Sequence, residues 1–503
     1  MDVLGITKDA IGLITLLYEK YSEYQDADET IKSICTRLDG VRVRLELYEE
    51  YLFRAESNLR SRHKQVLVKS LERVTDILHD LSERLPDPIT VAKKFAWVAW
   101  GKRRVEGLLS DLDVWDNDSQ RTIFTYDMLN RIRGHDLHYE RLFNTGDRSL
   151  AATWSLSRRI HSSNEVRLVP NIAIPPETTI TIAESDYRYR YMARLGSELV
   201  YIETLPHRRH DNGGERRQVI ERQNRIAEVF HSSDLPSMHL LSCLGTVRHH
   251  LVYEIPKPDV EMGGLHWNGS VPTLAGVLGN EIRMSLEDRF RIASEITVAV
   301  MTIHAAGWVH KDIRSDNVLF FYEENRQGYI TRTTQIGSAY LVGFGGARPQ
   351  TSTSARYTEN DLVKRRYQHP ERKGTSVEKF DIRHDMYSLG VVLIELGLQR
   401  LLSELNDQDG EDIGARKDQK GIEEDHTYLV NKSAHELRDI MGSKYVNAVL
   451  TCLTKSTQKE KTTDVLREEF YDDVLVPLKE IFEGLKMRCS IVRSCLQYRI
   501  RCE

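Results

Sequence analysis

The sequence has few cysteines and no long hydrophobic run. Six cysteines are spread over 503 residues without an even, closely spaced framework, which argues for a reducing compartment. Nowhere do about 18 apolar residues run together, so no constitutive transmembrane helix is expected. The N-terminus lacks a basic segment and a small-residue cleavage site, which excludes a secretory signal peptide. We expect a cytoplasmic chain that can still be recruited to a membrane.

The chain also has no large excess of charge of one sign. Its formal net charge of -5 gives no whole-protein reason to expect a nucleic acid as partner, and none is expected. Hydrophobic residues at 40% and charged residues at 29% are typical of soluble globular proteins. A chain of 503 residues is too long for one ordinary core, so two or three domains are expected.

Residues 1–135 carry helical periodicity almost without a break. Apolar residues recur at intervals of three or four along three segments, which is typical of amphipathic helices. The stripes are Val3, Ile6, Ala10, Leu13, Leu17 and Tyr21; Ile31, Ile34, Leu38, Val41, Leu45, Tyr48 and Leu52; and Leu67, Leu71, Val74, Leu78, Leu81 and Leu85. Pro86 and Pro88 end the third helix, and a fourth stretch follows at 91–115. Helices on short connections share their apolar stripes, which predicts a helical bundle.

The order of these helices resembles the fungal HeLo domain. The resemblance covers roughly residues 1–135 and is carried above all by Lys94-Phe95-Ala96-Trp97, which is followed by Lys102 and a leucine-rich helix. HeLo domains are related to helical bundles that permeabilise membranes in cell death. The resemblance implies a role in prion inhibition and propagation or in programmed cell death. Its implied partners are further copies of the bundle and membrane lipids.

The first helix admits two interpretations. A stripe of Val, Ile and Leu residues is most simply a contribution to the bundle core. Residues 3–17 are nevertheless apolar on more than one face, and Leu16 lies about 100° away from the stripe. A helix with so wide an apolar arc suits a second burial environment such as a bilayer. A terminal helix can also detach without breaking two connections.

From about residue 186 the pattern changes to mixed α/β. Segments 192–205 and 240–256 are rich in Val, Tyr, Leu and Ile, which predicts strands, and 285–307 predicts a long helix. Directly after that helix comes GWVHKDIRSDNVLFF, which resembles the protein-kinase catalytic loop H-R-D-L-x-x-x-N at matching spacing. Its last residues, Val318-Leu319-Phe320, read as the strand that should follow this loop.

The resemblance implies a role for each matching residue. His310 takes the His position, and Lys311 replaces Arg. Asp312 takes the position of the catalytic base, and Asn317 takes that of a metal ligand. In a kinase the carboxylate accepts the proton of the attacking hydroxyl, and the amide oxygen five residues on reaches magnesium.

Three later segments follow in the order that kinases have them. Gly343-Phe344-Gly345 occupies the D-F-G slot, and His369-Pro370-Glu371 resembles A-P-E. The segment from Asp385 to Gly390, DMYSLG, resembles the helix whose aspartate hydrogen-bonds the catalytic-loop backbone. His310, Glu371, Asp385 and Gly390 are the residues implied to have structural roles. The expected fold class is α + (α+β), an N-terminal helical bundle followed by a two-lobed protein-kinase-like fold over residues 186–484.

The groups that handle phosphate are missing from this kinase-like segment. Gly343 stands where D-F-G has the aspartate that holds magnesium. Val200-Tyr201-Ile202-Glu203 matches V-A-I-K, with Glu203 in place of the lysine. No glycine occurs from Thr178 to Leu195, so the phosphate-cradling G-x-G-x-x-G is absent too. The cofactor positions are therefore Glu203, Gly343 and Gly345, and Asp312 and Asn317 are expected to be vestigial.

The remaining segments are expected to be connectors. Residues 136–185 read as a linker or brace, 207–222 as a solvated charged loop, and 405–426 as an exposed insertion. Residues 485–503 form a tail that combines Cys489, Cys495 and Cys502 with basic residues, the composition of a palmitoylated, polybasic membrane anchor. A tail without structure is the simpler interpretation.

Three functions fit this organisation. The leading hypothesis is a pseudokinase-regulated signalling or cell-death switch, in which an upstream protein regulator acts on the kinase-like domain and the bundle is a membrane-targeting or oligomerising effector. An alternative is an active Ser/Thr-type protein kinase with an atypical ATP and metal site. The third is a non-catalytic scaffold. No cofactor and no metal site are expected, and ATP with magnesium would be a weak ligand. The architecture is similar to that of the mixed lineage kinase domain-like protein of animals, which is an analogy only.

Overall fold

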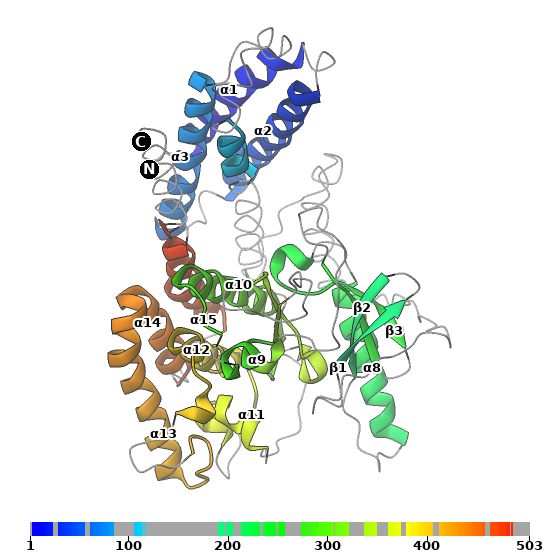
Figure 1. Ribbon diagram of the computed structural model, residues 1–503, viewed down its shortest axis with the longest axis vertical. Helices are drawn as coiled ribbons and strands as arrows, with labels where there is room; N and C mark the ends of the chain where they lie inside the picture. The colour runs from blue at the N-terminus through cyan, green and yellow to red at the C-terminus, as the bar shows by residue number, and fades with distance from the viewer. Residues whose placement is uncertain are drawn as a thin grey trace, which may run out of the picture. The chain divides into compact units, whose positions relative to one another are not determined.

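The computed structural model describes residues 3–23, 29–55, 61–84, 105–113, 115, 190–195, 198–204, 213–231, 235–247, 250–256, 273–280, 282–305, 307–320, 336–349, 361–373, 379–405, 412–457, 463–482 and 484–485. The chain divides into an N-terminal unit, Met1–Trp154, and a C-terminal unit, Ser155–Glu503, which are described separately (Figure 1). The division falls within residues 136–185, the segment that the sequence assigns to a linker. Among the described residues, no helix is long and apolar enough to cross a membrane.

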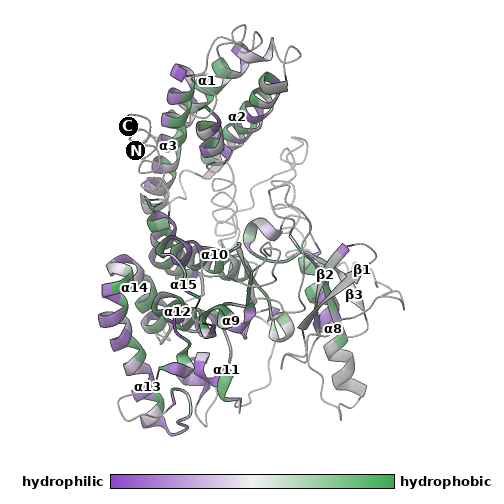
Figure 2. Ribbon diagram, in the orientation of Figure 1, coloured by the Kyte–Doolittle hydropathy of each residue, from purple (hydrophilic) through white to green (hydrophobic). Residues whose placement is uncertain are grey.

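The described part of the N-terminal unit is helical. Its elements are α1 (Val3–Ser22), α2 (Glu29–Ala55), α3 (Ser61–Arg84) and a further helical segment at 105–113. Helix α1 packs against both α2 and α3. Each of these three helices has hydrophobic residues on part of its surface and hydrophilic residues on the rest (Figure 2). The helix-rich N-terminal region is confirmed, whereas residues 94–97 and Lys102, which carry the HeLo resemblance, lie outside the described residues.

The apolar stripes predicted for α2 and α3 are buried, from Ile31 to Leu52 and from Leu67 to Leu81. On α1 the prediction was partly wrong, because Ile6 and Leu13 are only partly buried and Thr7 and Ile14 lie in the core instead. Thr7 can be buried because its hydroxyl donates to the Val3 carbonyl oxygen over 2.8 Å. The buried stripe of α1 is Val3, Thr7, Ala10, Ile14, Leu17 and Tyr21.

The segment at 105–113 and Trp115 extend the same core. The Trp115 indole N–H donates to the Ser70 carbonyl oxygen on α3 over 2.8 Å, and its ring centroid lies 6.1 Å from that of Tyr48 on α2. Arg37 of α2 and Asp113 form an ion pair of 3.1 Å. The fourth apolar stretch of the sequence therefore joins the other helices where it is described.

The described part of the C-terminal unit begins with a four-stranded antiparallel sheet. Strands β1 (Arg190–Leu195), β2 (Glu198–Thr204), β3 (Cys243–Val247) and β4 (His250–Glu254) lie in the order β1-β2-β4-β3. Strands predicted in 192–205 and 240–256 are thus confirmed. One face of the sheet buries Val200, Ile202 and Val252 together. Because side chains alternate along a strand, Tyr201 and Glu203 point to the other face.

Helix α8 (Gly213–Phe230) lies against β3 and β4. The prediction of a solvated loop over 207–222 is therefore wrong from residue 213 onward. The missed signal lies further along the chain, where Ile226, Ala227 and Phe230 form a buried stripe at helical spacing. Packing of this stripe against the sheet forms the helix in spite of its charged beginning.

The rest of the described C-terminal unit is mainly helical. Its longer elements are α9 (Leu274–Gly279), α10 (Leu286–Ala305), α11 (Leu362–Tyr367), α12 (Ile382–Leu398), α13 (Gln419–Lys432), α14 (Arg438–Thr454) and α15 (Thr463–Phe470). The short strands are β5 (Trp308–Val309), paired with β8 (Arg348–Pro349), and β6 (Val318–Phe320), paired with β7 (Ala339–Leu341). Single turns are η3 (Leu235–Met238), η4 (Ser315–Asn317), η5 (Phe344–Gly346), η6 (Pro370–Arg372), η7 (Leu402–Glu404) and η9 (Lys455–Thr457), and η8 (Ser433–Leu437) and η10 (Tyr471–Leu475) are π-helical. The helix predicted at 285–307 and the strand at Val318–Phe320 are confirmed.

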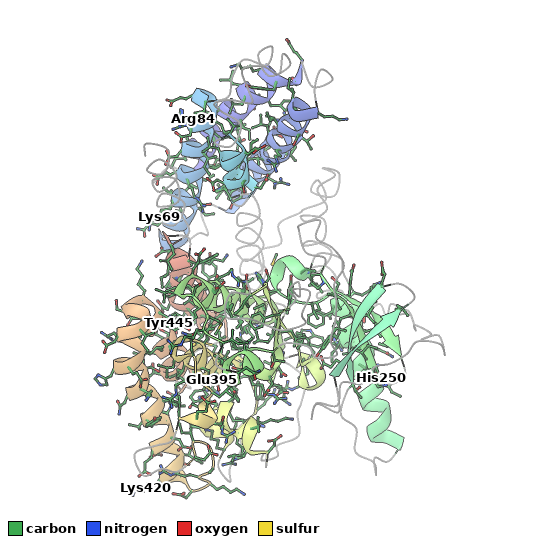
Figure 3. The ribbon with its side chains drawn as sticks, in the orientation of Figure 1. Lys69, Arg84, His250, Glu395, Lys420 and Tyr445 are labelled. Atoms are coloured by element: carbon green, nitrogen blue, oxygen red, sulfur yellow. The ribbon has the colours of Figure 1, made fainter. Side chains whose placement is uncertain are left out.

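Helix α12 forms the centre of this helical lobe, and its residues are almost all buried. Gly390 allows α14 to approach closely, because a Cβ at this position would lie 2.9 Å from the Cβ of Cys452. The Tyr445 hydroxyl of α14 donates to the Leu393 carbonyl oxygen of α12 over 2.7 Å, and Figure 3 shows Tyr445 and Glu395 among the packed helices. Hydrophilic residues lie along the outer side of α13 and α14 (Figure 2).

The segment 405–426 is not an exposed insertion in its described part. Ile413 is completely buried, and the Gly414 N–H donates to Asp425 over 2.8 Å. Helix α13 begins within the segment, after the Asp418 side chain has capped it. A few apolar residues at helical spacing, including Ile422 and Leu429, anchor a segment whose overall composition is charged.

Candidate functional site

The loop between β5 and β6 contains His310, Lys311, Asp312 and Asn317. The Asp385 carboxylate, in the first turn of α12, accepts hydrogen bonds from the backbone N–H groups of His310 (2.7 Å) and Lys311 (2.9 Å). Nε2 of His304 lies 3.2 Å from the same carboxylate. Burial raises the pKa of the Asp385 carboxyl, but the hydrogen bond and charge of His304 and the proximity of His310 outweigh it and hold the pKa below its ordinary value. Helix α12 therefore fixes the start of the loop.

Lys311 has a φ of 75°, in the left-handed region. Such a conformation costs a non-glycine residue roughly 1–3 kcal/mol and persists only where surrounding contacts impose it. Its N–H bond to Asp385 is one such contact. The strained residue directly precedes Asp312 in the loop.

Asp312, in the position of the catalytic base, is paired within its own loop. Arg314 Nε lies 3.1 Å from Asp312 Oδ1, and Arg314 Nη1 lies 3.0 Å from Asp316 Oδ2. The buried Asn317 donates its side-chain N–H to the Asp312 carbonyl oxygen. Its Oδ1 has no hydrogen-bond partner among the described residues. The loop therefore holds Asp312 and Asn317 together and leaves one amide oxygen available as a ligand.

Glu203 and Gly343, from opposite lobes of the C-terminal unit, meet in the structure. Glu203 on β2 is buried, and its Oε2 accepts a hydrogen bond from the Gly343 N–H over 3.1 Å. Gly343 has a φ of 93° and a ψ of 37°, a left-handed conformation that glycine adopts without strain. Gly345 follows in η5 and is partly buried. The two residues that the sequence comparison assigned to the positions of the kinase lysine and aspartate thus contact each other as a carboxylate and a backbone amide.

Two tyrosines that the sequence reasoning missed occupy the same face of the sheet as Glu203. Tyr201 on β2 is paired in register with Tyr253 on β4, and their ring centroids lie 6.0 Å apart. Both side chains are completely buried. In the match to V-A-I-K, Tyr201 stands at the alanine, so a large ring replaces a methyl group beside the lysine position. The period of two between Tyr201 and Glu203 is the signal that could have identified it.

An aromatic stack connects the loop to the sheet-side helix α8. The His310 ring centroid lies 4.7 Å from that of Phe344, which lies 4.4 Å from that of Phe230. His310 Nε2 also lies 3.1 Å from the Val342 carbonyl oxygen. The loop, the segment after β7 and α8 are therefore packed as one assembly.

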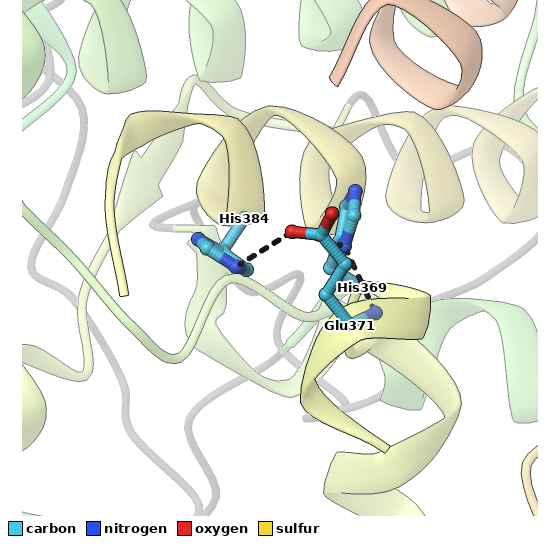
Figure 4. Close-up of side chains that lie close together, drawn as sticks. All are labelled: His369, Glu371 and His384. Atoms are coloured by element: carbon cyan, nitrogen blue, oxygen red, sulfur yellow. Dashed lines mark hydrogen bonds and ion pairs between the residues drawn. The ribbon is translucent and has the colours of Figure 1, made fainter. Parts of the chain in front are cut away.

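Glu371 lies in η6, in a separate group of contacts at the start of α12 (Figure 4). Its Oε2 lies 3.7 Å from Nη1 of Arg383, whose other nitrogens donate to Asp381. The structure thus divides the predicted site residues into two groups. Glu203, Gly343, Asp385 and the 310–317 loop form the first. Glu371 forms the second with Arg383 and Asp381.

Comparison with known proteins shows what this region is similar to. Residues 265–471 match the family model of the protein kinase domain, a match that begins after β4. A probable serine/threonine-protein kinase of Clostridium perfringens is 27% identical over 125 residues, which are 25% of this chain and 16% of that protein. The L-type lectin-domain containing receptor kinase V.8 of Arabidopsis thaliana is 27% identical over 199 residues, 37% of this chain and 27% of that protein. The chain therefore spans a minor part of these relatives.

Among solved structures, a chain of the yeast RNA polymerase II CTD kinase CTDK-1 complex aligns with 60% of this chain and 95% of its own length, at 15% identity and a TM-score of 0.39. The low score adds nothing to the assignment. The family match, the sequence order of the motifs and the contacts of the 310–317 loop agree. Residues 265–471 are therefore similar to a protein kinase domain, and the C-terminal part of the chain has a kinase-like fold.

Proposed function

We propose that the C-terminal unit is a pseudokinase, a signalling switch that has lost phosphate transfer. The observation that supports this best is the hydrogen bond from Gly343 to Glu203. Kinases neutralise the charge of the transferred phosphate with a lysine and with magnesium held by an aspartate, and these are the two positions that contact each other here. Losing one group that stabilises transition-state charge typically costs about a hundredfold or more in rate.

The described cleft residues do not fit a magnesium–nucleotide complex. Asn317 Oδ1 offers one ligand atom, but Gly343 has no side chain to offer a second. Glu203 would place a buried negative charge near the phosphates. Tyr201 and Tyr253 fill the sheet face beside it. Together these replacements weaken phosphate binding, remove a metal ligand and reduce the space for a nucleotide. We therefore favour loss of nucleotide binding over a rearranged site.

We expect Mg-ATP to bind the full chain with a Kd no tighter than about 1 mM, because the buried Glu203 stands where a kinase has its phosphate-binding lysine. Isothermal titration of residues 1–503 with Mg-ATP, and a thermal shift at the same concentrations, measure this. The matched control is Asn317→Ala, which removes the remaining metal-type ligand. A micromolar, magnesium-dependent Kd in the natural protein that this variant loses would contradict the proposal.

An active kinase is the second candidate. Asp312 and Asn317 keep their positions, and the unpartnered Oδ1 of buried Asn317 is what a bound cation would satisfy. The matching relatives are themselves described as kinases. This candidate requires an atypical metal site, because the cleft lacks the usual aspartate and lysine. Phosphate transfer that depends on Asp312 distinguishes the two candidates.

We further propose that the N-terminal unit is the effector and acts by self-association or at a membrane. The structural support is that α1 has an apolar side chain outside its buried stripe, Leu16, which is 66% exposed. Phe53 on α2 is also exposed. Exposed large apolar side chains on amphipathic helices are suited to a second surface, either another copy or lipid headgroups.

Leu16→Gln is expected to abolish killing on overexpression in a fungal host while leaving the fold intact. Leu16 is exposed, so its loss should change the free energy of unfolding by no more than about 0.5 kcal/mol. Membrane insertion, by contrast, would lose the transfer free energy of a leucine and bury an amide. Viability of the host and thermal unfolding of the purified variant are the two measurements.

The neighbouring Leu17→Gln is the matched control, because Leu17 lies in the buried stripe and its replacement should unfold the bundle. Killing retained by a well-folded Leu16→Gln variant, or no killing by the natural protein, would exclude α1 as a membrane-inserting helix. A scaffold would then be the better account of the N-terminal unit.

A further inference from the structure

The outer face of α1 combines an exposed leucine with a glycine and four charged residues. At about 100° per residue these positions lie on one side of the helix, opposite the buried stripe that begins at Val3 and ends at Tyr21. Leu16 is 66% exposed and follows Gly12 by one turn. A Cβ at Gly12 would have no atom within 4 Å, so the helix surface is open there. The exposed residues of this face are Lys8, Asp9, Gly12, Leu16, Glu19 and Lys20.

The four charges are arranged in a regular order along this face. Lys8 and Glu19 lie on one edge of the face, and Asp9 and Lys20 lie on the other, because 11 positions make about three full turns of helix. Each edge therefore has a positive charge at one end and a negative charge at the other. The signs are reversed between the two edges. Such a face is complementary to a copy of itself that runs in the opposite direction.

An antiparallel copy of α1 matches all four charges in one register. In a two-fold symmetric pair centred at the level of Ile14, positions equally far before and after this level lie beside each other. Lys8 then lies beside Glu19 of the second copy, and Asp9 lies beside Lys20 of the second copy. The symmetry repeats each contact, so the pair contains each ion pair twice.

The same register places the leucine against the glycine. Leu16 lies beside Gly12 of the second copy, where it covers the surface that the missing side chain leaves open. A parallel copy does not have this property, because each residue then lies beside its own counterpart and Lys8 meets Lys8. Like charges placed opposite each other disfavour that arrangement. The antiparallel pair is therefore the one that the face specifies.

The contacts of these lysines within the chain are loose enough to be exchanged. Lys8 Nζ lies 3.8 Å from Glu49 Oε1, and the Lys8 side chain is 66% exposed, so solvent screens this ion pair. Lys20 Nζ lies 5.9 Å from the ring centroid of Tyr21. Glu19 of a second copy would add a second carboxylate beside Lys8. Pairing therefore does not leave a charge buried without a partner.

We propose that α1 packs antiparallel on α1 of a second copy of this chain, with Leu16 against Gly12 near the centre and the ion pairs at the ends. The proposal rests on the self-association proposed above for the N-terminal unit, and it names the surface that carries it. A lipid surface fits this face less well, because charges surround the one leucine and two of them are acidic. One helix face is a small interface, so we expect a Kd in the micromolar range.

Sedimentation equilibrium of the full chain at micromolar concentrations measures the dimer. Lys8→Glu and Glu19→Lys should each raise its Kd at least about tenfold, because each places like charges together twice in the symmetric pair. The double variant should return the Kd to within about threefold of the natural value, because the two signs are exchanged. The matched control is Lys69→Glu, which changes an exposed lysine of α3 and alters the net charge equally. It should leave the Kd unchanged.

Gly12→Gln and Leu16→Gln test the centre of the interface. A side chain at Gly12 meets no atom of its own chain within 4 Å at the Cβ, so α1 should keep its fold. The new side chain occupies the surface that Leu16 of the second copy covers. Each variant should therefore raise the Kd at least about tenfold. Circular dichroism identifies the folded variants.

A dimer that each single charge reversal weakens and the double variant restores supports the proposal. A monomer at every concentration, or a dimer that the folded single variants leave unchanged, would overturn it. So would a monomer that binds vesicles of anionic phospholipid through Leu16, which would assign the face to lipid. Killing of a fungal host tests the effector role separately. A charge-dependent dimer without killing keeps this surface and removes that role, and killing without a dimer does the reverse.

Discussion

Asp385→Ala is expected to lower the free energy of unfolding of the C-terminal unit by about 3–5 kcal/mol. The buried carboxylate accepts from the backbone N–H groups of His310 and Lys311 and contacts His304. Alanine leaves both backbone donors without their acceptor, and each buried orphan costs roughly 1–3 kcal/mol. It also releases Lys311 from the contact that holds its left-handed conformation.

Thermal and denaturant unfolding of the full chain, followed in the transition of the C-terminal unit, measure this effect. Asp361→Ala is the control, because Asp361 is an exposed helix cap on α11 and its loss should cost only about 1 kcal/mol. Hydrogen exchange should locate the damage, with faster exchange at the 310–317 loop. An unchanged melting temperature for Asp385→Ala would count against the fold assignment itself.

The stability of the C-terminal unit should also fall as pH rises, through Glu395. This residue of α12 is buried and accepts from the hydroxyls of Ser315 and Tyr367 and from the Leu402 N–H (Figure 3). Burial raises the pKa of its carboxyl from 4.5 to about 7, and the hydrogen bonds offset only part of the shift. The folded state therefore binds the proton more tightly than the unfolded state. The resulting stability is fully present below about pH 4.5 and is lost as pH rises through about 7.

The expected loss between pH 4.5 and pH 8 is about 3 kcal/mol, at 1.36 kcal/mol for each pKa unit. Glu395→Gln should remove this part of the pH dependence, because glutamine resembles the protonated acid in size and charge. His369 acts in the opposite sense, since its pKa is lowered and its burial favours the fold at higher pH. The contribution of Glu395 is therefore the difference between the pH dependence of the unfolding free energy in the natural protein and that in Glu395→Gln. Parallel pH profiles of the two proteins would contradict the assignment.

The regular elements were largely predictable because each has a pattern that burial imposes. The periodicity of apolar residues was enough to predict α2, α3 and the strands around Val200 and Val252. Helix α8 and the start of α13 were missed because their first residues are charged and the apolar positions that bury them come later. The charged composition of these segments reflects their solvent-exposed side. Their helical structure depends on tertiary contacts with the sheet and with the helical lobe.

The site could be predicted in part. Spacing alone assigned Asp312, Asn317 and Gly343 to positions in the order of the kinase motifs, and their roles stay a prediction. It could not indicate that the Glu203 carboxylate accepts from the Gly343 N–H, because that contact joins two lobes across 140 positions of sequence. Tyr253 was missed because only the strand register brings it opposite Tyr201.

The measurement that tests the central claim most directly is transfer of labelled phosphate from ATP by the full chain, with Asp312→Ala as its partner. If Gly343 and Glu203 replace the groups that hold magnesium and neutralise phosphate, as we propose, no phosphate is incorporated into the protein itself or into generic protein substrates. The natural protein and the variant should be indistinguishable. Incorporation by the natural protein that Asp312→Ala abolishes would contradict the pseudokinase assignment and establish an active kinase with an atypical site.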